Sequence, residues 1–195
     1  MANKVGSSEG HNRGAVIMRL LLDMYPVRAD DSTGLVAVEL GTNMGHLCTY
    51  LALRGWGLLS ELHTVDWYYE SPLTHEEVAD RFAEIGFETC SHKEPLVASA
   101  PHPIIAMCSA VGSPRLKVFI HKALTQEAGR VLQDHSVDLV FVDGDHSYAG
   151  AKRDIDAWLS KVRPGGIMSG HDFRFGVGSG ERRRLYDGDV RHAVA

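Results

Sequence analysis

Acidic and histidine residues end or follow several short apolar runs of this sequence, and their side chains could bind a ligand or move a proton. They are Glu39, Asp66, Asp143 and the pair His171-Asp172. Carboxylates accept hydrogen bonds from sugar hydroxyls and bind hard cations, and a neutral imidazole takes up a proton near neutral pH. Because the carboxyl ends of parallel strands meet at one edge of a sheet, we expect these residues to form one site.

The segment from Glu39 to Gly45 reads E-L-G-T-N-M-G, with glycines at Gly41 and Gly45. Glycine permits a tight turn and a close approach of the backbone to a ligand. A dinucleotide site favours G-x-G-x-x-G, whose middle glycine makes room for a pyrophosphate, and Asn43 stands at that position. The turn alone is also typical of nucleotide folds with no particular cofactor, but it favours a ligand without a pyrophosphate.

Asp66 ends an apolar run roughly 20 residues beyond the turn, where a carboxylate can accept hydrogen bonds from ribose hydroxyls. The turn and Asp66 together predict an adenosine-like ligand. Trp67, Tyr68 and Tyr69 come next and could form a pocket wall, but aromatic residues after a strand more often pack in the core. We therefore leave these three residues outside the predicted site.

The elements that must position these residues alternate along the chain. Apolar runs predict strands at 35–40, 62–66, 117–120, 137–142 and 167–170, and helical periodicity predicts helices at 12–24, 46–53, 75–85, 123–132 and 148–162. The proline-containing stretch 95–103 is interpreted as an irregular insertion. This alternation predicts an α/β fold with a doubly wound, mainly parallel sheet. We expect one domain over 1–195, with an N-terminal helical cap (1–33), a core (34–173) and a short tail (174–195).

Several motifs occur in order: the glycine turn, Asp66, V-F-V-D-G-D-H at 140–146 and R-P-G-G at 163–166. With these motifs the chain resembles, from about Val36 to Asp172, the class I S-adenosylmethionine-dependent methyltransferases, whose sheet is Rossmann-like. The run D-G-D-H-S-Y, followed by R-P-G-G and then His171-Asp172, is similar to the small-molecule O-methyltransferase branch that includes macrolide-sugar enzymes.

The resemblance implies how the cofactor S-adenosylmethionine would be bound. Gly41 and Gly45 would line its methionine part, Asp66 would hold its ribose, and Glu39 would support the turn. The expected cofactor-binding residues are Glu39, Gly41, Thr42, Asn43, Gly45 and Asp66.

The resemblance also implies a divalent metal, held by Asp143, His171 and Asp172. Two carboxylates favour Mg²⁺, which prefers oxygen ligands. The imidazole of His171 would instead favour Mn²⁺, Fe²⁺ or Zn²⁺, or would point away, so the identity of the metal stays open.

His146, three residues after Asp143, stands where the related enzymes place a general base, and a neutral imidazole suits that role. Asp145 could orient His146 or serve as a further metal ligand. Alternatively, Asp145 or Ser147 could cap the helix that follows.

Composition argues for an ordinary globular protein of 195 residues, with 44% hydrophobic residues and a formal net charge of −5. That charge offers no broad basic surface for nucleic acid or an anionic membrane, and we interpret the dense run Arg182-Arg183-Arg184 as solvated. Three cysteines without C-x-x-C spacing make a disulfide framework unexpected. The N-terminus lacks the apolar core of a signal peptide, and no apolar run reaches transmembrane length, so a cytoplasmic location is expected.

After Phe173 too few residues remain for the helix and antiparallel hairpin that normally complete the resembled fold. We therefore expect either a fragment of a longer chain or a sheet without the C-terminal hairpin, whose exposed last strand would favour association, such as a homo-oligomer. The predicted function is metal-assisted O-methyl transfer from S-adenosylmethionine to a small hydroxylated acceptor. The alternatives are a non-catalytic binding or assembly module with the same fold and, disfavoured by Asn43, an NAD-linked oxidoreductase.

Overall fold

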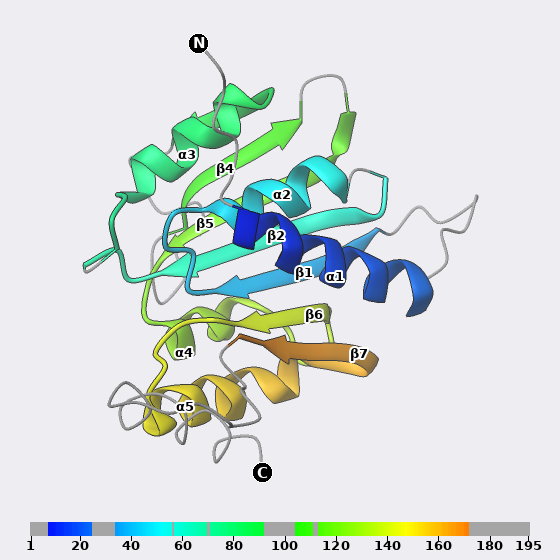
Figure 1. The fold of residues 1–195 in the computed structure, drawn as a ribbon, viewed down its shortest axis with the longest axis vertical. Helices are drawn as coiled ribbons and strands as arrows, with labels where there is room; N and C mark the ends of the chain where they lie inside the picture. Colours follow the sequence, from blue (N-terminus) through cyan, green and yellow to red (C-terminus); the bar gives the residue numbers. More distant parts are fainter. Residues whose placement is uncertain are drawn as a thin grey trace.

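The fold is built on one sheet, shown in Figure 1. The computed structural model describes residues 8–24, 34–55, 57–69, 71–91, 104–110 and 113–171. The predicted insertion at 95–103, the predicted metal ligand Asp172 and the arginine run at 182–184 lie outside these residues.

Seven strands form the sheet in the spatial order β3-β4-β5-β2-β1-β6-β7. Their bounds are β1 Leu35–Leu40, β2 Leu59–Asp66, β3 Phe87–Ser91, β4 Ile104–Ala110, β5 Ser113–Lys122, β6 Val137–Val142 and β7 Val162–Gly170. Five neighbours, β5, β2, β1, β6 and β7, run parallel, whereas β4 is antiparallel to both β3 and β5. The prediction of a mainly parallel, doubly wound sheet is confirmed.

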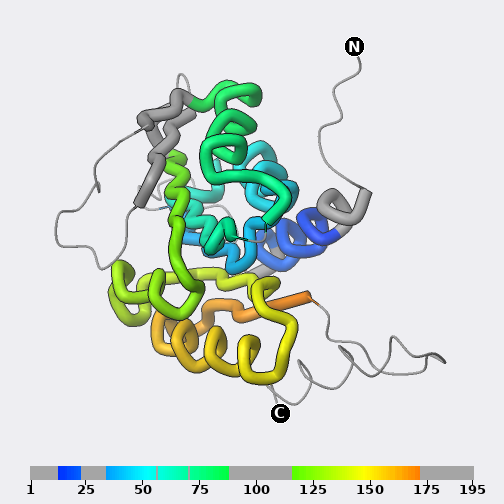
Figure 2. The backbone as a smooth tube through the Cα atoms, turned by 90° about the vertical axis from the view of Figure 1, so that its left-hand side faces the viewer, coloured from blue at the N-terminus to red at the C-terminus, as the bar shows by residue number. Residues whose placement is uncertain are grey.

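Helices cover both faces of this sheet (Figure 2). The helices α1 (Ser8–Met24), α2 (His46–Arg54) and α3 (His75–Glu84) pack through one hydrophobic cluster, and α4 (Thr125–Ala128) and α5 (Tyr148–Trp158) through a second. Ala37 and Val38, neighbours on β1, pack in the first and the second cluster respectively, because successive side chains of a strand point to opposite faces. No helix among the described residues is long and apolar enough to cross a membrane.

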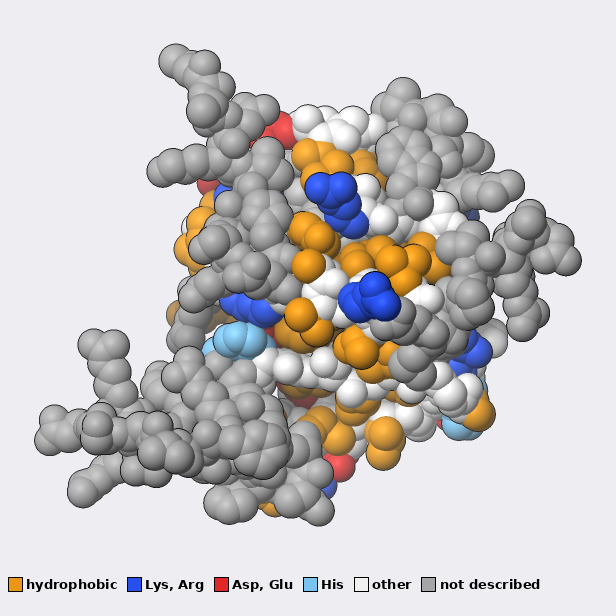
Figure 3. Space-filling model, turned by 45° about the vertical axis from the view of Figure 1, so that its right-hand side comes forward, with side chains coloured by type: hydrophobic (Ala, Val, Ile, Leu, Met, Phe, Trp, Pro, Cys, Tyr) orange, Lys and Arg blue, Asp and Glu red, His pale blue; other side chains and the backbone are white. Residues whose placement is uncertain are grey.

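Hydrophobic side chains also reach the surface and gather on one face of the molecule (Figure 3). On α1, Val16 is 61% exposed, and Leu20 and Leu22 are exposed as well. Scattered apolar residues are normal on protein surfaces. The homo-oligomer expected from the sequence stays a prediction.

The main difference from the predicted fold is that two strands, β3 and β4, lie between α3 and β5, where the sequence predicted none. These two strands extend the sheet beyond β5 by antiparallel pairing: β4 forms a hairpin with β5, in which Ala110 pairs with Ser113, and β3 pairs with β4. At the other edge, β7 begins at Val162 and not at residue 167. The preceding helix ends at Trp158 and is followed by a 3₁₀ turn, Leu159–Lys161. An edge strand tolerates the proline and glycines of R-P-G-G, since one side of its backbone needs no partner strand.

Gly41 joins the ends of two strands. It follows β1 with a φ of +90°, and a Cβ at this position would lie 2.1 Å from the backbone carbonyl oxygen of Asp143, which follows β6. The N–H of Asp143 in turn donates to the carbonyl of Leu40 at 2.8 Å. Only glycine meets both demands, a left-handed φ and contact with another backbone.

We predict that Gly41→Ala destabilises the protein more than Gly86→Ala does. Gly86 has a matched φ of +92° but open space where its Cβ would lie, so its substitution costs the backbone strain alone. Displacement of the Asp143 backbone should add roughly 1–3 kcal/mol to the loss in the free energy of unfolding for Gly41→Ala. Urea unfolding of both variants measures the difference, and equal losses would contradict the prediction.

Candidate functional site

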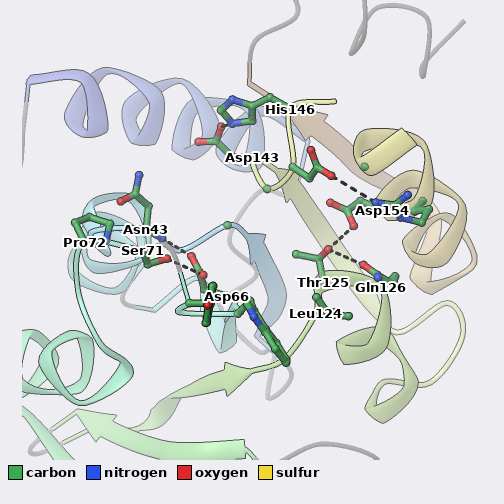
Figure 4. Close-up of a pocket in the computed structure, with 17 residues that line it drawn as sticks. Asn43, Asp66, Ser71, Pro72, Leu124, Thr125, Gln126, Asp143, His146 and Asp154 are labelled. Carbon is green, nitrogen blue, oxygen red and sulfur yellow. Dashed lines mark hydrogen bonds and ion pairs between the residues drawn. The ribbon is translucent and has the colours of Figure 1, made fainter. Parts of the chain in front are cut away.

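A cavity of about 540 Å³ opens at the carboxyl edge of the parallel strands (Figure 4). Its walls come from the turn after β1, the loop after β2, the start of α4 and the segment that leads from β6 into α5. Ligands of doubly wound sheets bind at this edge, and the volume lies in the range of small-molecule sites.

Three protein donors hold the carboxylate of Asp66 in the wall of this cavity. The backbone N–H of Asn43 donates to Oδ2 at 2.8 Å, and the backbone N–H of Tyr68 and the hydroxyl of Ser71 donate to Oδ1, each at 2.8 Å. A carboxylate has about four acceptor sites, so further acceptor capacity remains for a ligand. The carboxylate is therefore oriented by the protein itself.

The predicted cofactor residues divide into two groups. Gly41, Asn43 and Asp66 line the cavity. Glu39, Thr42 and Gly45 do not line it and are buried beneath or beside the turn. Gly45 has a φ of +70° and precedes α2, which explains glycine there by conformation.

A buried hydrogen-bonded group supports the turn from below. The hydroxyl of Thr64 donates to Oε2 of Glu39 at 3.0 Å and is itself hydrogen-bonded to the hydroxyl of Thr42. The pKa of Glu39 is raised to about 8, mainly by burial and to a smaller extent by the charges of Asp143 and Asp66, while hydrogen bonds with Thr64 and Cys48 oppose the rise. Glu39 is therefore mostly protonated at neutral pH, and its carboxyl is part of the hydrogen-bonded group beneath the turn.

The carboxylate of Asp143 gathers three cationic or basic side chains. The Arg13 guanidinium of α1 donates to Oδ2 at 2.6 Å, while His146 Nε2 and His171 Nδ1 each lie 3.6 Å from Oδ1. The sequence predicted that Asp143, His146 and His171 would meet, and the structure brings these three residues together. Asp143 and His146 also line the cavity.

The predicted metal site does not fit this arrangement. Arg13 places a permanent positive charge 2.6 Å from Oδ2 of Asp143, which disfavours a second cation at this carboxylate. Among the side chains that the structure describes, no group of three or more His, Cys, Asp or Glu residues is arranged to hold a metal ion. Asp172, the remaining predicted ligand, lies outside the described residues. We therefore assign no metal to the described part of the site.

The turn after β6 is held by the start of α5. The Ser147 hydroxyl accepts a hydrogen bond from the N–H of Gly150 at 3.0 Å, which confirms the helix cap considered for Ser147. Asp145 accepts from the N–H of Ser147 at 2.9 Å, and its other oxygen lies 3.4 Å from Arg153. Asp145 therefore serves this turn, and these contacts give no evidence that it orients His146.

Several cavity residues were not predicted. Trp67 and Tyr69, which the sequence analysis expected in the core, are exposed and line the cavity, as do Thr125 and Gln126 after β5. The sequence signal that could have identified these four residues is their position just after the end of a strand. Arg13 had no such signal, because α1 meets the turn after β6 only through tertiary packing.

The chain matches the family described as "Methyltransferase domain" over residues 38–173, more than half of its length. The chain belongs to this methyltransferase family. This methyltransferase domain also shares 28% identity over 137 residues with the uncharacterized protein y4gI of Sinorhizobium fredii, a match that covers 69% of this chain and 13% of that protein. It therefore spans a small part of this relative.

Two solved structures are similar to the domain in fold. A protein of Corynebacterium glutamicum aligns over 96% of this chain and 75% of its own, with a TM-score of 0.54 and 18% identity. A geranyl diphosphate methyltransferase in complex with SAM aligns over 94% of this chain and 64% of its own, with a TM-score of 0.52 and 11% identity. Family and fold together confirm the prediction of a class I S-adenosylmethionine-dependent methyltransferase, and the O-methyltransferase branch stays a prediction.

We predict that the buried carboxyl of Glu39 makes the protein less stable as pH rises. Its pKa is raised on folding, so between its ordinary value of 4.5 and about 8 the unfolded chain releases a proton that the folded chain keeps. Glu39 should lower the free energy of unfolding across this window by about 4–5 kcal/mol, and Glu39→Gln should remove this contribution.

Urea unfolding at several pH values measures this effect. Glu84→Gln, at an exposed glutamate of α3, serves as the matched control and should keep the wild-type pH profile. Parallel profiles for Glu39→Gln and the wild type would show that the burial of Glu39 does not cause the pH dependence.

Proposed function

We propose that this methyltransferase domain transfers a methyl group from S-adenosylmethionine to a hydroxyl group of a small acceptor. The observation that carries the proposal is the oriented carboxylate of Asp66 in the cavity wall, which follows β2 and is hydrogen-bonded to the glycine turn. A ribose diol presents two adjacent donors to such a carboxylate. The O-methyl chemistry rests on the resemblance at 143–148 and on the basic residue His146.

The residues of the cavity fit the chemical parts of this cofactor. Asp66 would accept hydrogen bonds from the ribose hydroxyls, and Gly41 and Asn43 would form the wall beside the methionine part. Asp66 supplies a carboxylate that complements a cation. When bound, the cofactor supplies a methyl group activated by attachment to a positively charged sulfur.

His146 would act as the general base. With the Nε2 proton directed toward Asp143, its Nδ1 would accept the proton of the acceptor hydroxyl, and the imidazolium would be stabilised by the Asp143 carboxylate at 3.6 Å. The acceptor oxygen would bond to the methyl carbon as the carbon–sulfur bond breaks, and that electron pair would stay on sulfur. Arg13 would hold Asp143 in place for this contact.

The metal assistance predicted from the sequence has no step in this proposal. Arg13 already pairs with Asp143, the residue at which the resemblance places the metal, and the described side chains form no three-ligand metal group. The chain spans 13% of the curated relative that it matches. We therefore propose the small-molecule acceptor from the site alone and make no statement on partners of a longer protein.

We predict that Asp66→Ala weakens the binding of S-adenosylhomocysteine by about 10- to 100-fold, since it removes hydrogen bonds to a charged group. Isothermal titration calorimetry of the wild type and the variant measures the affinity. Asp80→Ala, at an exposed aspartate of α3, is the matched control and should bind as the wild type does. No binding by the wild type, or equal binding by a folded Asp66→Ala variant, would contradict the cofactor assignment.

We predict that His146→Ala lowers kcat by about 10²- to 10⁴-fold while the affinity for S-adenosylhomocysteine stays within a few-fold of the wild type. The assay uses a panel of sugar and phenolic acceptors in the presence of EDTA, where the wild type should stay active. Wild-type activity that requires added Mg²⁺ would contradict the metal-free proposal. Cofactor binding without turnover on any acceptor would favour the non-catalytic module.

A further inference from the structure

We propose that a buried pair of histidines, His63 and His121, weakens cofactor binding as the pH falls. The two rings share a hydrogen bond that persists when the pair holds one added proton and breaks when it holds two. Its loss would displace the strand ends that carry Asp66 and one wall of the cavity. The proposal rests on the proposed function, since it assumes that S-adenosylmethionine binds in this cavity.

The two histidines lie on neighbouring strands of the sheet, outside the cavity and unused by the proposed mechanism. His63 is on β2 and His121 is on β5, and both are buried. Nδ1 of His63 lies 2.9 Å from Nε2 of His121. A contact of this length between two ring nitrogens requires one hydrogen between them, so one nitrogen donates and the other accepts.

A carboxylate on the other side of His63 decides which nitrogen donates. Nε2 of His63 lies 3.3 Å from Oε2 of Glu61. The hydrogen bond from His63 lowers the pKa of Glu61, partial burial opposes this shift, and the charges of His63 and Lys117 add to it. An ionised carboxylate only accepts, so Nε2 of His63 carries a hydrogen. In the neutral pair, Nδ1 of His63 is therefore the acceptor and Nε2 of His121 the donor.

A first added proton leaves the bond in place. With this proton on Nδ1, His63 becomes an imidazolium that donates to Nε2 of His121, and His121 keeps its own hydrogen on Nδ1 instead. The Glu61 carboxylate stabilises the imidazolium, as does the ring of Phe119, which stacks on His63 with centroids 4.6 Å apart. The Glu61 side chain is 37% exposed and so connects the pair to solvent.

A second added proton breaks the bond. Both facing nitrogens would then carry a hydrogen, and two positively charged rings would lie with their centroids 5.2 Å apart in a buried place. Two donors form no hydrogen bond, and like charges repel strongly where little solvent separates them. In the unfolded chain the two histidines are independent, and each takes up a proton near pH ~6.5. Below this pH the folded pair binds fewer protons than the unfolded chain, so acid disfavours the bonded arrangement.

The ionisable residues around the pair supply charge for one imidazolium. They are Glu61 and Lys117 on the same face of the sheet, Asp66 and Lys122 at the strand ends, and Glu127 and Arg130 in and after α4. The neighbouring strand β1 contributes the apolar Val38 and Leu40 to this face, and β4 contains no Asp, Glu, His, Lys or Arg. Glu61 is hydrogen-bonded to the pair, and one carboxylate balances the charge of one imidazolium, not of two.

The pair lies directly before the strand ends that form the cavity. β2 and β5 are neighbours in the sheet (Figure 1), and Lys122, the residue after His121, pairs with Asp66. The N–H of Ala123 donates to the backbone carbonyl of Asp66 at 3.0 Å, and Leu124 then lines the cavity. Separation of the two histidines would therefore move the cofactor-binding carboxylate relative to the opposite wall.

A packing role is the competing account, in which the two rings only fill space between the strands. His121→Gln separates the two accounts. The amide of glutamine can donate or, after rotation, accept, so the bond to His63 persists whether His63 is neutral or charged. The variant cannot hold the second positive charge. Under the packing account, the variant and the wild type would show the same pH dependence.

The experiment is calorimetry of the full chain with S-adenosylhomocysteine near pH 7.5 and near pH 5. We expect the affinity of the wild type to fall, between these two conditions, by about tenfold more than that of His121→Gln. His135→Asn is the matched control, at an exposed histidine whose positive φ asparagine tolerates, and should fall as the wild type does. Equal falls in the wild type and a folded His121→Gln variant would overturn the proposal and leave the proposed function intact. Failure of the wild type to bind at either pH would overturn the proposed function and this proposal with it.

A measurement on the wild type keeps the proposal testable if His121→Gln does not fold. In protein labelled with ¹⁵N-histidine, the shared hydrogen should give a nitrogen–nitrogen coupling between Nδ1 of His63 and Nε2 of His121 in NMR spectra. We expect this coupling near pH 7.5 and its loss near pH 5. Absence of the coupling near pH 7.5, or its persistence near pH 5, would overturn the proposal, and neither result depends on a bound cofactor.

Discussion

The contact between Gly41 and the backbone of Asp143 is the constraint on which the site depends. It brings the end of β1 within van der Waals distance of the end of β6, and the hydrogen bond from Asp143 to Leu40 fixes the pair. The β1 turn then reaches Asp66 through the N–H of Asn43, and the carboxylate of Asp143 meets Arg13 and two histidines. A larger residue at 41 would separate these two halves of the cavity wall.

Acidic residues surround this contact, and the structure limits their mutual repulsion in different ways. Glu39 stays protonated at neutral pH because it is buried, so it adds little charge beside Asp66 and Asp143. Asp66 is stabilised by three donors, and Asp143 by the Arg13 guanidinium. Asp154 accepts one hydrogen bond through Oδ1, while Oδ2 has no partner among the described residues.

The central part of this arrangement could be predicted from the sequence, because it depends on local signals. The apolar runs gave the bounds of β1 and β6 as the structure has them, and Asp66 and Asp143 were placed at the correct edge by the geometry of parallel sheets. The remainder depends on long-range packing. The pairing of β3 with β4 and the contact of Arg13 with Asp143, 130 residues away, leave no periodic pattern in the sequence. Asp154 was missed for the same reason, since its position in a helix is polar by sequence but buried in the fold.

A crystal structure of the protein with bound S-adenosylhomocysteine tests the account most directly. The account predicts the ribose hydroxyls within hydrogen-bond distance of Asp66 and the sulfur on the side of His146. A ligand whose ribose lies away from Asp66, or whose sulfur points away from His146, would contradict it.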